Sequence, residues 1–132
     1  MEAQEGIAVW VSYNANRDGR RVGDCTIRAI MGATGKSWNS VFWGIVWEAF
    51  LQADIMSSNP VWAAYLRRQG FTRHAVPDEC PDCYTIEDFA ADHPVGDYIV
   101  ATPGHVVYLH DGDWWDTWDS GGETVTYFWR RG

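Results

Sequence analysis

Cys25, His105 and Asp116 are the residues whose types and order could form a nucleophilic site. Cys25 lies where the loop "RRVGD" gives way to a helical pattern, and the N-terminus of a helix stabilises a thiolate. A thiol nucleophile needs a base, and the base needs a third group that fixes its tautomer and stabilises its cation. His105 would be the base and Asp116 the orienting acid. The competing interpretation is that Cys25 is a small buried residue at a helix start.

The place of the aspartate depends on the turn at residues 111–112, an Asp-Gly pair that is a strong hairpin signal. A two-residue turn puts His105 and Asp116 on one face of neighbouring strands, within diagonal reach of each other. A three-residue turn would move Asp116 to the opposite face. Asp119 is the alternative third member.

The elements that must position these residues follow from the periodicity. Helical spacing and capping signals predict four helices, at 24–35, 37–54, 60–70 and 84–96. Ser37 is expected to cap the second helix, and Thr85 with Asp88 resembles a capping box at the start of the fourth. The second helix is apolar on most of its surface, so it is expected to be buried on more than one side.

Alternating patterns predict strands at 6–14, 97–104, 105–112, 113–120 and 123–131, whereas 71–83 is expected to be a loop. Helices therefore occupy the first half and strands the second, which is typical of an α+β fold. We expect one domain over residues 1–132, with N-terminal helices packed on a C-terminal, mostly antiparallel sheet.

The composition excludes several classes of function. The net charge of −8 disfavours a surface that binds a nucleic-acid backbone. No apolar run approaches the ~20 residues that span a bilayer, so no membrane insertion is expected. The start "MEAQEGIAVW" lacks the apolar core of a signal peptide, which predicts a cytoplasmic protein with reduced thiols.

Cys80 and Cys83 form a CxxC pair that could be half of a zinc site, with His74 and His93 as further ligands. The spacing of the two histidines is loose. The favoured interpretation is a pair of loop thiols without a metal, and we expect no cofactor.

Four stretches together resemble a known superfamily: "DCTIRAI", "TIEDFAADHPVGDYIV", "GHVVYLHDG" and "DTWDS". The chain resembles a papain-like cysteine peptidase in a minimal form, similar to the small peptidases of bacterial cell-wall hydrolases and bacteriocin-processing domains. It also resembles short phage and prophage proteins that share these motifs in this order. The resemblance covers nearly the whole chain and implies a papain-like fold, with the nucleophile, base and acid on the three residues above.

The chain departs from the papain-like pattern at one position. Papain-like enzymes carry an upstream polar side chain, usually Gln, as an oxyanion donor, and the corresponding residue here is Gly19. Asn16 or Asn14 is expected to substitute, together with the backbone N–H of Cys25.

Trp114 and Trp118 share the predicted face of Asp116 and are candidates for a substrate groove. The alternative, which we favour for most of the nine tryptophans, is that they are core residues between sheet and helices.

Two functions follow from the sequence. The first is a phage-type cysteine hydrolase that cleaves a peptide, isopeptide or other amide bond through a thioester on Cys25. The second is a catalytically silent papain-like protein that binds or inhibits a host component. In both cases the expected partner is a protein or peptide in the host cytoplasm.

Overall fold

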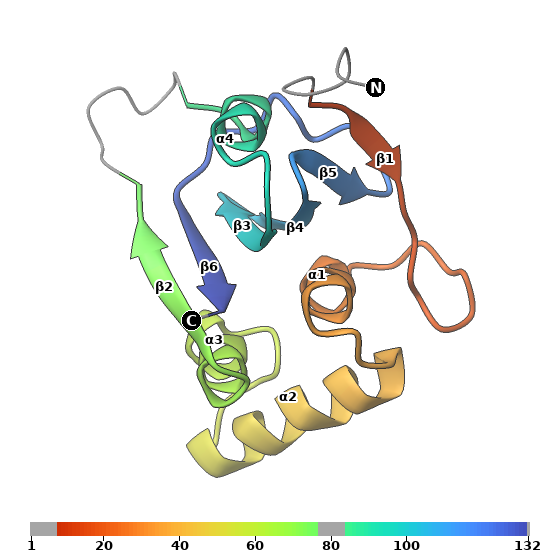
Figure 1. Cartoon of the computed structure of the whole chain (residues 1–132). Helices are drawn as coiled ribbons and strands as arrows, with labels where there is room; N and C mark the ends of the chain where they lie inside the picture. The colour runs from red at the N-terminus through yellow and green to blue at the C-terminus, as the bar shows by residue number, and fades with distance from the viewer. Residues whose placement is uncertain (1–7, 77–83, 132) are drawn as a thin grey trace.

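The computed structural model describes residues 8–76 and 84–131, which form four helices and a six-stranded mixed sheet (Figure 1). The helices are α1 (Cys25–Thr34), α2 (Trp38–Gln52), α3 (Asn59–Arg68) and α4 (Ile86–Asp92). The strands are β1 (Trp10–Ser12), β2 (Phe71–Ala75), β3 (Asp97–Thr102), β4 (His105–His110), β5 (Asp113–Asp116) and β6 (Tyr127–Arg131). The predicted α+β class is confirmed.

The strand order is β1-β5-β4-β3-β6-β2, with β1 parallel to β5 and the other neighbours antiparallel. The sheet separates two hydrophobic clusters. One lies between the sheet and α1, α2 and α3, and the other lies between the sheet and α4 (Figure 1). Helix α2 forms the outside of the helical layer and packs mainly on α1 and α3.

Helix α1 lies close against β4 because it has a glycine at the crossing point. A Cβ atom on Gly32 would lie 2.4 Å from the ring of Tyr108, far inside van der Waals contact. This close approach sets how near α1 lies to β4.

Capping residues define two of the helices as predicted. The Ser37 hydroxyl accepts a hydrogen bond from the N–H of Ser40 at the start of α2. Thr85 and Asp88 form a complete capping box at the start of α4.

Two of the predictions about elements are wrong. Residues 71–75, expected to be part of a loop, form strand β2 and pair with β6 at the sheet edge. Helix α2 is not buried on more than one side, because Trp43, Trp47 and Phe50 are 65%, 57% and 72% exposed. Strand β1 is shorter than the predicted 6–14, and it joins the sheet at the opposite edge from β2.

Within residues 8–76 and 84–131, none of the helices has both the length and the apolar character that a membrane crossing requires.

Candidate active site

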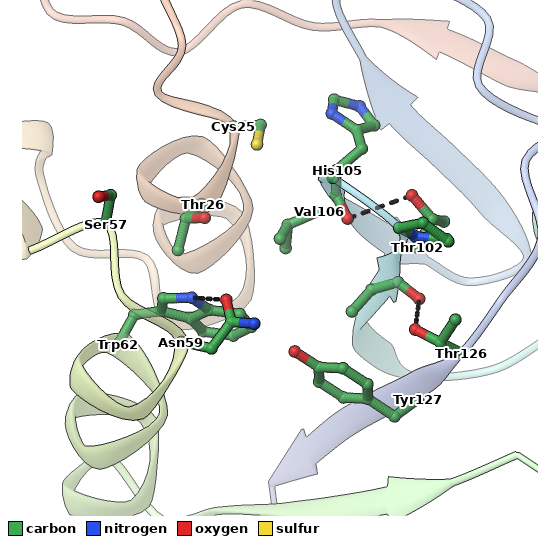
Figure 2. Close-up of a pocket in the computed structure, with 13 residues that line it drawn as sticks. Cys25, Thr26, Ser57, Asn59, Trp62, Thr102, His105, Val106, Thr126 and Tyr127 are labelled. Carbon is green, nitrogen blue, oxygen red and sulfur yellow. Dashed lines mark hydrogen bonds between the residues drawn. The ribbon is translucent and has the colours of Figure 1, made fainter.

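Cys25 is the first residue of α1, as the sequence predicts. The first N–H groups of a helix have no partner within the helix, so they present partial positive charge at this position. Figure 2 shows Cys25 at the start of α1 and His105 across from it, where β4 begins. The helical layer therefore contributes the thiol and the sheet contributes the imidazole.

Asp116 holds the imidazole of His105. The His105 Nε2 atom lies 2.5 Å from the Asp116 Oδ2 atom, and the Asp116 side chain is 3% exposed. The hydroxyl of Ser120 donates to the same oxygen at 2.8 Å, and the N–H of Thr117 donates to Oδ1 at 2.8 Å. These bonds orient the carboxylate and leave Nδ1 as the ring nitrogen that can exchange a proton with the thiol.

The predicted hairpin register brings this pair together. Asp111 and Gly112 both have positive φ, at 48° and 86°, which is the conformation of a two-residue hairpin turn. His110 pairs with Asp113 across it, so Asp116 lies on the same face as His105.

Asp119, the alternative third member, is engaged elsewhere. Its Oδ1 atom accepts hydrogen bonds from the indole N–H of Trp114 at 2.9 Å and from the N–H of Gly121 at 3.1 Å. Of the two aspartates, Asp116 is the one that contacts the imidazole.

The thiol and the imidazole shift each other's pKa in the directions that an ion pair requires. Burial raises the pKa of the Cys25 thiol, but the contact with His105, the N–H of Val106 and the charge of Arg28 hold this pKa below its ordinary value. Burial lowers the pKa of His105, whereas the hydrogen bond to Asp116 and the contact with Cys25 raise it to about 9. Each shift favours the charged form of its group, a thiolate on Cys25 and an imidazolium on His105.

Asp24, next to the thiol, is an anion whose charge is compensated. Its Oδ1 atom lies 3.2 Å from the Nε atom of Arg28, although the two atoms are not aligned as a hydrogen bond, and both side chains are buried. The indole N–H of Trp38 and the side-chain amide of Asn16 donate to Oδ2 at 3.0 and 2.9 Å. Asp24 thus anchors the start of α1 to the loop and to α2.

Asn14 and Asn16, the predicted oxyanion donors, both use their side-chain amides in other hydrogen bonds in this structure. The amide of Asn16 donates to Asp24, and the amide of Asn14 donates to the carbonyls of Gly19 and Arg20. Neither asparagine lines the cleft beside the thiol. The remaining donor from the sequence prediction is the N–H of Cys25.

A cleft of about 520 Å³ lies between the start of α1, the start of α3 and the turn that joins β3 to β4 (Figure 2). Its polar lining comes from residues that the sequence reasoning did not single out: Thr26, Ser57, Asn59, Thr102, Thr126 and Tyr127. The Oδ1 atom of Asn59 accepts from the indole of Trp62, and within the part of the chain that the structure describes its Nδ2 atom makes no hydrogen bond. The "NP" pair signals only a helix start, so the sequence gives no hint of this amide.

A second hollow of about 320 Å³ adjoins the cleft and shares Thr26 and Ser57 with it. Most of its lining is apolar: Val22, Ile27, Trp38, Phe42, Ile45 and Met56. The two hollows together form a surface on which a polar and an apolar part of one ligand can lie on either side of the first turn of α1.

The two tryptophans proposed for a groove have different environments. Trp114 is 4% exposed and packs in the cluster beneath α4, so its predicted place in a groove is wrong. Trp118 is 44% exposed, and its ring centroid lies 5.1 Å from that of His105. Trp118 therefore lies against the imidazole and outside the set of residues that line the cleft.

The zinc alternative is only partly visible, because Cys80 and Cys83 lie outside the described residues. The Nδ1–H group of His93 donates to the carbonyl of Phe89, the His93 ring stacks on the Phe89 ring, and His74 contacts Thr72. Over residues 8–76 and 84–131, no three His, Cys, Asp or Glu side chains are grouped as metal ligands.

Comparison with family models, with curated proteins and with solved structures found no match to this chain.

Proposed function

We propose that the chain is a papain-like thiol hydrolase that cleaves a peptide, isopeptide or other amide bond. The observation that carries the proposal is the arrangement of Cys25, His105 and Asp116. A thiol with a lowered pKa lies at a helix N-terminus and faces an imidazole that a buried carboxylate holds at 2.5 Å. This is the arrangement that nucleophilic catalysis requires.

In the proposed reaction the Cys25 thiolate attacks the amide carbonyl carbon, and the carbonyl π electrons move to the oxygen. The N–H of Cys25 donates to that oxyanion. The tetrahedral intermediate then collapses, the C–N bond breaks and His105 gives its proton to the leaving amine. Water attacks the thioester with His105 as the base, which releases the acid and restores the thiol.

The surroundings of the thiol favour a peptide-like substrate. The hydroxyl and amide groups of the cleft can bond to backbone N–H and C=O groups, and the adjoining apolar hollow can take an aliphatic or aromatic side chain. The resemblance to phage proteins suggests that the substrate is a protein of the host cell or of the phage.

The proposal is tested by trapping the acyl intermediate. A p-nitrophenyl ester with an apolar acyl group is mixed with the protein, and the intact mass is read at short times. Wild type is expected to gain one acyl group on Cys25 and to release p-nitrophenol in a burst, whereas Cys25→Ala should do neither. Acylation of Cys25→Ala at the same rate as wild type would contradict the proposal.

A second candidate is a papain-like protein that binds a host component without cleaving it. The observation that favours it is that the side-chain amides of Asn14 and Asn16 are engaged in other hydrogen bonds, so that neither asparagine stands in for the missing glutamine. The absence of an acyl intermediate, combined with stoichiometric capture of a host protein that is lost when the cleft residue Asn59 is replaced by Arg, would support this candidate.

A further inference from the structure

Helix α2 and the residues just after it expose several large apolar side chains. Four lie on the helix, Trp43 65%, Trp47 57%, Phe50 72% and Leu51 50% exposed, and Ile55, 68% exposed, follows the end of the helix. We call these five residues the α2 face. The rings of Trp47 and Phe50 stack on each other with centroids 5.5 Å apart, so the face is continuous at its centre. The site described above does not use any of these side chains.

The area of the α2 face lies at the upper end of the range for the largest apolar patch of a monomer and close to that of half an interface. With roughly 200 Å² for each side chain, the exposed fractions leave on the order of 600 Å² of apolar surface. A typical monomer has a largest apolar patch of about 300–600 Å². A standard stable interface buries about 800 Å² on each partner, so the α2 face supplies most of one such half.

The charge distribution selects the occupant. The chain carries a net charge of −8, so two copies repel each other over most of their surfaces. Helix α2 is different, because its only ionisable side chain is Glu48, which is buried and paired with Arg68. A membrane surface would be expected to require Lys or Arg beside the apolar face, and α2 contains neither.

We propose that the α2 face is the contact of a symmetric dimer, and that its occupant is the α2 face of a second copy of this chain. An uncharged, apolar and aromatic surface is complementary to itself, which a two-fold contact requires. Trp43, Trp47 and Phe50 follow the alternating spacing of four and three residues by which paired helices pack along a seam. In the single chain α2 is buried on one side only, and a dimer would bury its second apolar side as well.

The dimer leaves the cleft beside Cys25 open. Helix α2 lies on the outside of the helical layer, with α1 and α3 between it and the sheet (Figure 1). The cleft beside Cys25 lies between those inner helices and the sheet. The proposal therefore stands or falls independently of the proposed hydrolase.

The test is the molar mass in solution, measured by sedimentation equilibrium over roughly a hundredfold range of concentration, because a dimer obeys mass action. Wild type is expected to reach twice the mass of one chain, and Trp47→Glu and Phe50→Lys are each expected to stay at the mass of one chain. The matched control is Val95→Glu, since Val95 is 75% exposed and lies in the connection between α4 and β3, outside the α2 face. It should associate like wild type.

Circular dichroism of each variant checks that it is folded. We expect each to fold, because the replaced side chains are exposed. Wild type at the mass of one chain throughout the range would overturn the proposal, and so would Trp47→Glu that associates like wild type. Cosedimentation of a monomeric wild type with phosphatidylcholine vesicles, lost in Trp47→Glu, would overturn it in favour of a membrane.

Discussion

Asp116 joins three parts of the proposed site through its side chain, because it accepts hydrogen bonds from His105, Ser120 and Thr117. A carboxylate in this place stabilises the imidazolium and presents Nδ1 to the thiol. An asparagine has the same shape but would present an N–H group to one of its donors. Replacing Asp116 by asparagine therefore removes the charge and one acceptor but keeps the volume of the side chain.

At the residue scale we predict that Asp116→Asn lowers the rate of acyl transfer by roughly 10²–10⁴-fold. The pKa of His105, held at about 9 in the wild type, should fall because its main cause of elevation is removed. NMR titration of the His105 ring and burst kinetics measure the two effects.

Asp119→Asn is the matched control for this change. Asp119 bonds to Trp114 and Gly121 and does not contact the imidazole. Asp119→Asn keeps an Oδ1 acceptor for both donors and should leave the His105 titration in place. Equal effects of the two substitutions on that titration would contradict the assignment of Asp116.

At the scale of elements, the distance between thiol and imidazole depends on how closely α1 approaches β4. We predict that Gly32→Ala destabilises the fold by about 1–3 kcal/mol, because the added methyl group overlaps the ring of Tyr108. The sign of the change in the free energy of unfolding is diagnostic, since Gly→Ala inside a helix otherwise stabilises by about 1 kcal/mol. Urea unfolding measures the change.

Gly122→Ala is the control, since a Cβ at Gly122 meets nothing within 4 Å. It should leave the free energy of unfolding nearly unchanged. If Gly32→Ala proved as stable as wild type or more so, the close packing of α1 on β4 would be contradicted.

Much of the element pattern could be predicted from local signals. Ser37, Thr85 and the turn at 111–112 act through bonds to residues a few positions away, and each behaves as the sequence indicates. The hairpin turn alone sets which face Asp116 shares with His105, so the aspartate could be chosen on paper.

What could not be predicted depends on contacts that are distant in the sequence. Strand β2 pairs with β6, and the local sequence "FTRHA" contains no signal that indicates this partner. Asn16 is a plausible oxyanion donor by its place in the sequence, but in the folded chain its side-chain amide donates to Asp24. Asn59 and Tyr127 reach the cleft from α3 and β6, which only the fold brings near Cys25.

At the scale of the whole molecule, the candidate site lies where two layers meet. The helical layer supplies Cys25 and Asn59, and the sheet supplies His105 and Asp116. Neither layer contains both the nucleophile and its base, so the ion pair forms only when the helices are docked on the sheet. The reactivity of Cys25 is therefore expected to depend on the docking of the helices on the sheet.

The most direct measurement is the pH dependence of Cys25 alkylation by iodoacetamide, read by peptide mass in wild type and in His105→Ala. We predict that wild type reacts with a midpoint well below the free-thiol pKa of about 8.5, because His105 lowers the pKa of the thiol. The thiolate–imidazolium pair should persist as the pH rises until His105, with a pKa of about 9, loses its proton.

In His105→Ala the midpoint should move up, since burial of the thiol then acts without its main counterweight. That result would establish the Cys25–His105 pair. A wild-type midpoint at the free-thiol value, unchanged in His105→Ala, would contradict it.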